Sequence, residues 1–249
     1  MLKGLPLKEG LLMIVPLAIA GAFFLAWGWE GLGMPLLVLS ALLWFSFRNP
    51  QRIPPEGEEN IVAPADGRII EVRKGVSMPS QGHKGWLISI FMSLWDVHVN
   101  RAPVDCVVRS VDRKRGRFLP AFKARAPLEN ERNVLLAEGP KGIPIAMVQV
   151  AGILARRIIC RVRPGQRLKR GEPFGAIVFG SRVDLYLPLG IEILVGVGEK
   201  VRAGESVIGR LPKGGGNEER SQQEGEGHSP LAQWIDGGES PVRFFLPGE

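Results

Sequence analysis

The hydrophobic and polar positions divide the chain into an apolar N-terminal part, an alternating middle part and a polar tail. From Gly10 to Trp29 most residues are apolar and none is charged, and residues 31–47 are again uncharged and mostly apolar. About 20 apolar residues are needed for a helix to cross a bilayer. Because the connector between the two segments is only a few residues long, residues 1–54 are expected to form an antiparallel α-helical membrane hairpin.

Basic residues flank this hairpin at both of its ends, and its turn contains none. Lys3 and Lys8 precede the first segment, and Arg48 and Arg52 follow the second. Since basic residues stay on the cytoplasmic side, both ends are expected there, at the cell membrane. One alternative is a cleaved signal peptide, but the sequence has no small-residue cleavage site followed by a polar chain, which argues against it. A second alternative is a re-entrant hairpin.

The middle part, residues 55–210, has the period-2 pattern of β-strands. Residues 85–92 and 183–187 are predicted strands, and two short strands flank an Asp-Gly turn at residues 66–67 that is typical of a β-hairpin. A Gly-x-x-Leu/Val-x-x-Gly-Glu pattern occurs at residues 165–172 and again at 198–205. Each copy is typical of one β-hairpin in a lipoyl/biotinyl-like barrel-sandwich. The predicted fold is therefore mainly β, although the modifiable lysine of a carrier domain is missing.

Composition and charge change the picture in two ways. Residues 211–249 hold 3 basic and 7 acidic residues among Gly, Ser and Gln, so this tail is predicted to be disordered. The rest of the chain carries a net charge of +11 and would be attracted to an anionic partner. The basic run at residues 113–117, beside Phe118 and Phe122, would suit an anionic membrane surface, and a solvated loop is the alternative. No nucleic-acid motif accompanies these charges, so no nucleic-acid partner is expected. Cys106 and Cys160 match no metal-ligand spacing, and no metal is predicted.

The sharpest candidate for chemistry is Gly180-Ser181, which lies between the apolar run 175–179 and the alternating strand 183–187. The pair lacks the Asn-Gly or Asp-Gly chemistry of a tight hairpin. Glycine tolerates unusual dihedral angles, and a hydroxyl beside a strained peptide can attack the preceding carbonyl. The alternative is a β-bulge with an exposed serine.

Four segments together resemble the phosphatidylserine decarboxylases, in the form found in their short bacterial and archaeal branch. They read NIVAPADGRI (60–69), FMSLWDVHVNRAP (91–103), NERN (130–133) and FGSR (179–182), and the resemblance covers roughly residues 45–210. It implies cleavage of the Gly180–Ser181 bond into a β chain (1–180) and an α chain (181–249). Ser181 would become a pyruvoyl cofactor that forms a Schiff base with the substrate. His98 would protonate the carbanion left by carbon dioxide, and Asp66 would orient and charge-balance a basic partner.

The sequence departs from the family pattern at Arg101, where many relatives have a second histidine. Either His98 serves both self-cleavage and decarboxylation, or another base drives cleavage. The implied partners are a phospholipid substrate and the membrane, with a possible homo-oligomer. Three other functions compete: a non-enzymatic lipoyl-like adaptor, a decarboxylase of a soluble amino acid, and a decarboxylase of a related serine lipid such as archaetidylserine. The absence of a heptad run argues against the adaptor, and the hairpin argues against a soluble substrate.

Overall fold

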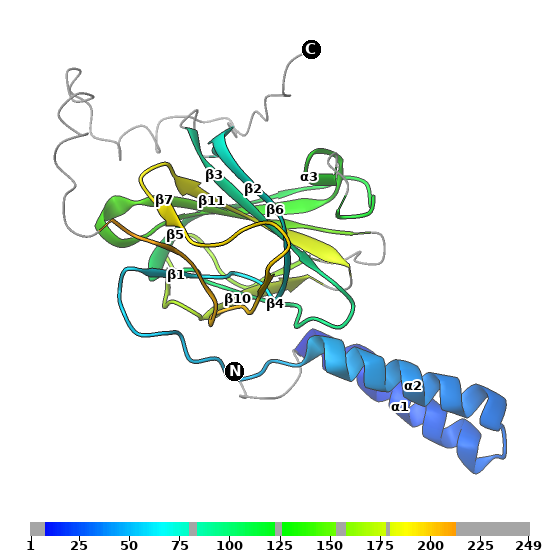
Figure 1. Cartoon of the computed structure of the whole chain (residues 1–249). Helices are drawn as coiled ribbons and strands as arrows, with labels where there is room; N and C mark the ends of the chain where they lie inside the picture. Colours follow the sequence, from blue (N-terminus) through cyan, green and yellow to red (C-terminus); the bar gives the residue numbers. More distant parts are fainter. Residues whose placement is uncertain (1–7, 80–83, 123–125, 153–157, 178–179, 213–249) are drawn as a thin grey trace, which may run out of the picture.

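A pair of helices stands beside a β-rich body in the computed structural model (Figure 1). The structure describes residues 8–79, 84–122, 126–152, 158–177 and 180–212. Helix α1 spans Lys8–Ala26 and α2 spans Glu30–Phe47, which confirms the predicted helix pair. Two short helical segments, α3 (Ala126–Glu129) and η1 (Pro140–Gly142), lie within the body. The predicted tail lies outside the described residues.

Small residues let the two long helices pack closely. A Cβ atom added to Gly33 would lie 2.6 Å from Leu25 Cγ and 2.9 Å from the Gly21 carbonyl oxygen. Close backbone approach of this kind stabilises helix pairs in membranes. Among the described residues, α2 is the one helix long and apolar enough to cross a membrane by length and composition, and the apolar part of α1, Gly10–Ala26, is shorter.

The described residues of the body form strands in three sheets. The strands are β1 (Asn60–Val62), β2 (Gly67–Ser77), β3 (Lys84–Met92), β4 (Val99–Arg101), β5 (Cys106–Lys114), β6 (Arg132–Glu138), β7 (Pro144–Val150), β8 (Ile158–Cys160), β9 (Arg167–Leu168), β10 (Pro173–Ile177), β11 (Ser181–Pro188), β12 (Glu192–Ile193), β13 (Lys200–Val201) and β14 (Val207–Arg210). The largest sheet has the order β13-β2-β3-β11-β7-β6-β5-β9, and the smaller ones have the orders β1-β14-β12 and β4-β10-β8. Strand β11 thus lies between β3 and β7, inside the largest sheet.

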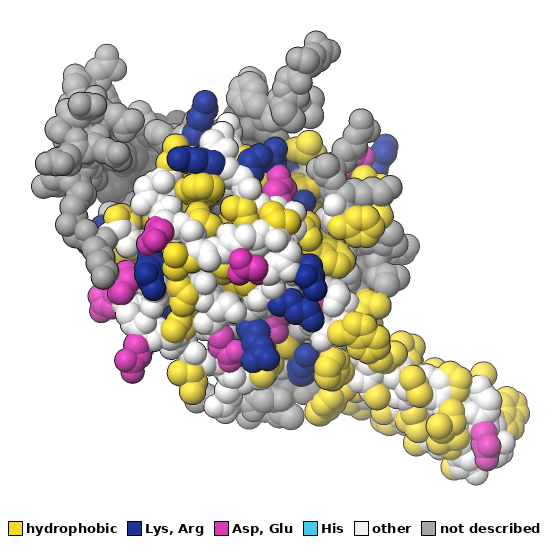
Figure 2. Space-filling model, in the orientation of Figure 1, with side chains coloured by type: hydrophobic (Ala, Val, Ile, Leu, Met, Phe, Trp, Pro, Cys, Tyr) yellow, Lys and Arg dark blue, Asp and Glu magenta, His cyan; other side chains and the backbone are white. Residues whose placement is uncertain are grey.

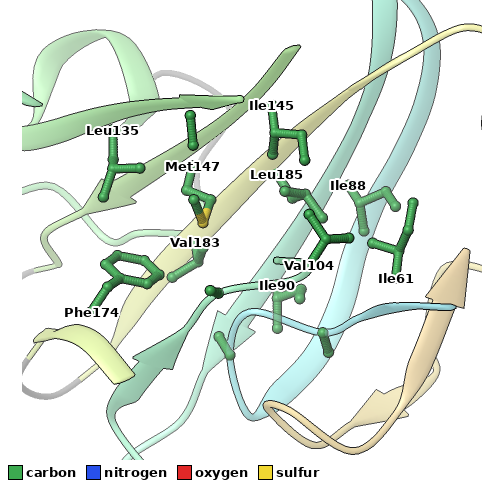
Figure 3. Packing of buried hydrophobic residues seen from close by; sticks show 14 of the residues in the cluster. Ile61, Ile88, Ile90, Val104, Leu135, Ile145, Met147, Phe174, Val183 and Leu185 are labelled. Atoms are coloured by element: carbon green, nitrogen blue, oxygen red, sulfur yellow. The ribbon is translucent and has the colours of Figure 1, made fainter. Parts of the chain in front are cut away.

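The main hydrophobic core lies where the sheets face one another (Figure 3). Val183 and Leu185 of β11 point into it, as does Met147 of the neighbouring strand β7. Phe174 of β10 and Ile61 of β1 reach it from the two smaller sheets and are completely buried. The alternation of β11 in the sequence therefore reports a strand with one face in this core.

An internal two-fold repeat organises the body around two turns, which we call the Asp66 turn (residues 63–67) and the Asp105 turn (residues 102–106). Each contains Ala-Pro-x-Asp, and each aspartate accepts a hydrogen bond of 2.7 Å from a backbone N–H, Ala203 for Asp66 and Arg170 for Asp105. The residue before each turn also donates a backbone hydrogen bond of 2.9 Å to the other turn, from Val62 to Pro103 and from Arg101 to Pro64.

The Gly-Glu repeat predicted from the sequence supplies the second layer of this two-fold arrangement. Gly204 donates its N–H to the Ala63 carbonyl, and Gly171 donates to Ala102. The two glycines have φ angles of 76° and 77°, a left-handed conformation that favours glycine. The matching sequence copies therefore have matching local structures.

Two details of the sequence prediction were wrong. The strands on either side of Asp66 and Gly67 do not form a hairpin, because β1 pairs with β14 whereas β2 pairs with β3 and β13. The two Gly-Glu copies are not hairpins either, since β9 pairs with β5 and β13 with β2. Turn chemistry predicted where the chain bends, but partner choice depends on the distant strands that share the core.

The helix pair packs onto the body at one end. A separate apolar cluster joins helix residues to strands β4, β8 and β10; its members are Ile14, Leu43, Phe47, Val97, Val99, Ile159 and Ala176. Phe47, the last residue of α2, is only 2% exposed. The end of α2 is therefore fixed against the loop that carries His98.

Candidate active site

Ser181 begins strand β11, where its hydroxyl is removed from water. It is completely buried and pairs with Met92 of β3, and within the described part of the chain its Oγ has no hydrogen-bond partner. A buried hydroxyl without a partner costs about 1–3 kcal/mol. Among the described residues no hydrogen bond offsets this cost, so the burial of the hydroxyl does not stabilise the fold.

Gly180 has a φ angle of 58°, in the left-handed region that disfavours other residues. A Cβ atom added to it would meet no heavy atom within 4 Å. Conformation, and not space, is therefore what favours glycine here. The first part of the sequence expectation, an unusual backbone before Ser181, is confirmed, whereas the alternative of an exposed serine is wrong.

His98 directly precedes β4, which pairs with β10, the strand before Ser181. Its carbonyl accepts a 3.2 Å hydrogen bond from the N–H of Ile177, at the end of β10. The imidazole is 2% exposed, and burial lowers its pKa to about 4, although the backbone of Ser46 and the Asp96 carboxylate act in the opposite direction. His98 is therefore neutral at physiological pH, and its ring is not hydrogen-bonded to the Ser181 hydroxyl.

Asp66 lies in the Asp66 turn, where its carboxylate has two partners. One oxygen accepts from the Ala203 N–H at 2.7 Å, and the other forms a 2.8 Å ion pair with Arg52, which also pairs with Glu205 at 2.7 Å. Burial raises the pKa of Asp66, and these partners oppose that shift. The basic partner of Asp66 is thus Arg52, from the linker that follows α2. A role in self-cleavage stays a prediction.

Arg101, the residue that replaces a second histidine, joins the same linker to the body. It is 5% exposed, and its guanidinium donates to the Asn49 side chain at 2.6 Å, the Pro50 carbonyl at 2.9 Å and the Gly171 carbonyl at 2.9 Å. A guanidinium stays protonated in proteins, so Arg101 cannot act as the base. Its contacts show a structural role instead.

Sequence reasoning missed a buried polar network on the opposite face of β11. Arg182, directly after Ser181, pairs with Asp184 and donates to Ser89 at 2.7 Å and to Glu71 at 3.1 Å. Burial would lower the pKa of Arg182, but Asp184 and Glu71 outweigh that effect and raise it. The signal in the sequence was the Arg-x-Asp spacing, which places both side chains on one face of a strand.

Sequence reasoning also missed the residues that surround the Gly180 carbonyl. A Cβ atom added to Gly152, just beyond β7, would overlap the Gly180 carbonyl oxygen. Asn130, which is completely buried, donates to the Ala151 carbonyl at 2.7 Å and so fixes the residue before Gly152. The NERN segment was the available signal for Asn130. No cluster of three or more His, Cys, Asp or Glu residues that could hold a metal occurs among the described residues.

Comparison with known proteins places the chain in a family. The family profile described as phosphatidylserine decarboxylase matches residues 39–209. The phosphatidylserine decarboxylase proenzyme of Magnetococcus marinus is 42% identical over 211 residues, which cover 84% of this chain and 96% of that protein. The proenzyme of Pelobacter propionicus is 47% identical over 176 residues, covering 71% of this chain and 79% of that protein. The chain belongs to the phosphatidylserine decarboxylase family.

Proposed function

We propose that this protein is a self-processing, membrane-associated decarboxylase that converts phosphatidylserine to phosphatidylethanolamine and carbon dioxide. The observation that carries the proposal is the buried Ser181 hydroxyl without a partner, next to a glycine in a left-handed conformation. Family membership supports the same activity.

Self-cleavage needs a hydroxyl that can reach the carbonyl before it. The Ser181 Oγ attacks the Gly180 carbonyl carbon, the C–N bond breaks, and the amide becomes an ester with a free Ser181 amine. Removal of the Ser181 α-proton then expels the Gly180 carboxylate from Cβ, which leaves dehydroalanine. Addition of water to its imine form releases ammonia and leaves a pyruvoyl group at the new N-terminus. Serine suits both steps because its oxygen is first nucleophile and then leaving-group oxygen.

The site fits a pyruvoyl group, because Ser181 sits inside the fold at the start of a strand whose neighbours hold it on both sides. When formed, that group supplies an electron-withdrawing carbonyl for loss of carbon dioxide from an amino acid headgroup. His98 is the proposed proton donor to the product carbon. Burial keeps the His98 imidazole neutral in the free protein. The negative phosphate and carboxylate of a bound headgroup would raise its pKa and so favour the protonated form that can donate a proton.

The helix pair supports a location at the cytoplasmic face of the cell membrane. Apolar side chains cover the helices, and Lys and Arg side chains lie on the adjoining part of the body (Figure 2). In the proposed arrangement residues 1–54 anchor the protein, residues 55–210 form the decarboxylase domain and the acyl chains of the substrate stay in the bilayer. The two-fold turns of the body support a lipoyl/biotinyl-like barrel-sandwich.

The test is an intact mass spectrum of the purified, folded protein. We expect two fragments that part between Gly180 and Ser181, with a pyruvoyl cap on the smaller one, and release of carbon dioxide from phosphatidylserine. A single intact chain of 27.2 kDa without decarboxylase activity would contradict the proposal.

A further inference from the structure

The Gly180 carbonyl oxygen rests against the backbone of Gly152, and this contact is possible only because residue 152 has no side chain. A Cβ atom at that position would overlap the oxygen, and it would lie 3.5 Å from the Ala121 Cβ. Gly152 is not one of the described glycines that have a positive φ. Glycine is therefore needed at this position for the close approach of the Gly180 carbonyl and not for the backbone conformation. The atom it accommodates belongs to the peptide bond proposed to be cleaved.

Asn130 fixes the backbone next to Gly152 through hydrogen bonds to Leu119 and Ala151. Its Oδ1 accepts from the Leu119 N–H at 2.8 Å, and its Nδ2 donates to the Leu119 and Ala151 carbonyls, both at 2.7 Å. A further bond of 3.0 Å, from the Ala151 N–H to the Glu131 carbonyl, fixes the other side of the same residue. One buried amide therefore links the loop before α3 to the segment that contacts Gly180.

We propose that Gly152 and Asn130 form a carbonyl seat that orients the Gly180 carbonyl for attack by Ser181. The inference rests on the proposed self-cleavage. Nucleophile and carbonyl must lie about 3 Å apart with the correct face presented, and a misplacement of about 1 Å can cost roughly 100-fold in rate. Both members are positioning residues, because neither exchanges a proton or a bond with Ser181.

The test compares Gly152→Ala with Gly190→Ala, since a Cβ at Gly190 meets no heavy atom within 4 Å. Cleavage is followed by mass spectrometry after synthesis, and folding by thermal unfolding. We expect Gly152→Ala to cleave at least about 100-fold more slowly and Gly190→Ala to match the wild type. Asn130→Asp, which keeps the acceptor for Leu119 and loses the donor to Ala151, should cleave about tenfold more slowly and remains informative if Gly152→Ala does not fold.

Hydroxylamine shows whether the attack of Ser181 on the Gly180 carbonyl, which forms the ester, is the step that a variant slows. It cleaves an ester at Gly180 but not an amide, leaving a hydroxamate on Gly180 and a free Ser181. The folded Gly152→Ala variant should release the Gly180 hydroxamate at least about 100-fold more slowly than the wild type, because its ester forms more slowly. Wild-type cleavage rates in folded Gly152→Ala and Asn130→Asp would overturn the seat, whereas an uncleaved wild type would instead overturn the proposed function.

A different observation concerns the loop at the end of α2. Leu94 and Trp95 are 43% and 64% exposed, yet their backbone is tied to the helix end, by Ser46 Oγ to the Leu94 carbonyl at 3.3 Å and by Arg48 to the Trp95 carbonyl at 3.2 Å. The Asp96 carboxylate stiffens the loop by accepting from the Ser93 N–H at 2.8 Å.

We infer that Leu94 and Trp95 insert into the membrane interface next to the helix pair, which rests on the proposed membrane insertion of that pair. Tryptophan is enriched at this depth because its ring is apolar and its N–H is polar. The helix end fixes the height of the loop, so these side chains lie where α2 leaves the bilayer. Lipid is therefore the partner that their exposure fits.

Spin labels in vesicles of phosphatidylcholine and phosphatidylglycerol test this placement. Trp95→Cys is compared with Val197→Cys, which has the same 64% exposure but lies before β13, in a Cys160→Ser background that leaves only the buried Cys106. We expect the label at 95 to collide several-fold more with oxygen than with a water-soluble nickel complex, and the label at 197 to show the reverse. A label at Leu12→Cys in α1 serves as the control for membrane insertion. If that label is in lipid, equal accessibility of the labels at 95 and 197 to oxygen and to the nickel complex overturns the inference. If it is in water, the proposed membrane insertion of the helix pair is itself wrong.

Discussion

The Asp66 turn and the Asp105 turn have matching backbone hydrogen bonds and different surroundings. Each aspartate accepts a 2.7 Å hydrogen bond from a backbone N–H in the Gly-Glu repeat. Asp105 is exposed, whereas Asp66 is 7% exposed and forms an ion pair with Arg52, from the linker after α2. Both turns therefore share the backbone contact, and the Asp66 turn has the ion pair with Arg52 in addition.

That difference separates two kinds of buried polar group in this protein. The carboxylate of Asp66 is satisfied on both oxygens, so its burial is explained by holding the helix linker on the body. The hydroxyl of Ser181 has no partner among the described residues, and the fold gains nothing from it. Polar groups that stabilise are paired, and an unpaired one calls for a chemical explanation.

The largest effect is expected for Ser181→Ala. Without the Oγ there is no nucleophile, so the chain should remain intact and the decarboxylase activity should be absent. Stability should be unchanged or slightly higher, because an unsatisfied buried hydroxyl is removed. Ser77→Ala, an exposed serine on β2, is the matched control and should be cleaved normally. An active Ser181→Ala protein would contradict the mechanism.

Removal of the imidazole comes next. His98→Ala should reduce decarboxylation by about 10²–10⁴, the usual contribution of a positioned acid. The rate is measured with phosphatidylserine in detergent micelles, and the mass of the same sample shows whether cleavage is lost as well. Activity close to wild type would exclude His98 as the proton donor.

The sequence predicted the elements of this fold better than their partners. The apolar segments, the alternation of β11 and the Gly-Glu repeat each correspond to a described element. Strand pairing could not be derived, because β1 and β2 are adjacent in sequence and pair in different sheets. The second turn could have been found from Ala-Pro-x-Asp at residues 63–66 and 102–105.

The candidate site shows the same limit. Ser181 and Gly180 stood out because a Gly-Ser pair between strands has few structural explanations. Gly152 did not, because its role depends on a carbonyl 28 residues further along the chain that only the fold brings next to it. The partner of Asp66 was likewise invisible, since Arg52 reaches it from the helix linker.

The comparison of the two turns can be tested directly. Asp66→Ala should lower the free energy of unfolding by about 3 kcal/mol, because it removes one of the two carboxylates that pair with the largely buried Arg52 side chain and leaves only Glu205. Asp105→Ala removes a cap on an exposed turn and should cost about 1 kcal/mol. Urea unfolding in detergent micelles measures both. Equal losses would show that the ion pair with Arg52 adds nothing to the shared cap, and normal cleavage of folded Asp66→Ala would limit Asp66 to a structural role.

The last effect is a dependence of stability on pH that His98 contributes. Burial lowers its pKa from about 6.5 in the unfolded chain to about 4 in the folded one, so between these values the unfolded chain binds the extra proton. Stability should therefore fall as the pH is lowered from 6.5 towards 4, by at most about 3 kcal/mol. Urea unfolding at pH 7 and pH 4.5 should show a smaller decrease in His98→Asn than in the wild type, because all other titrating groups are common to both. The same decrease in the two proteins would mean that the imidazole is solvated and not held neutral beside the end of α2.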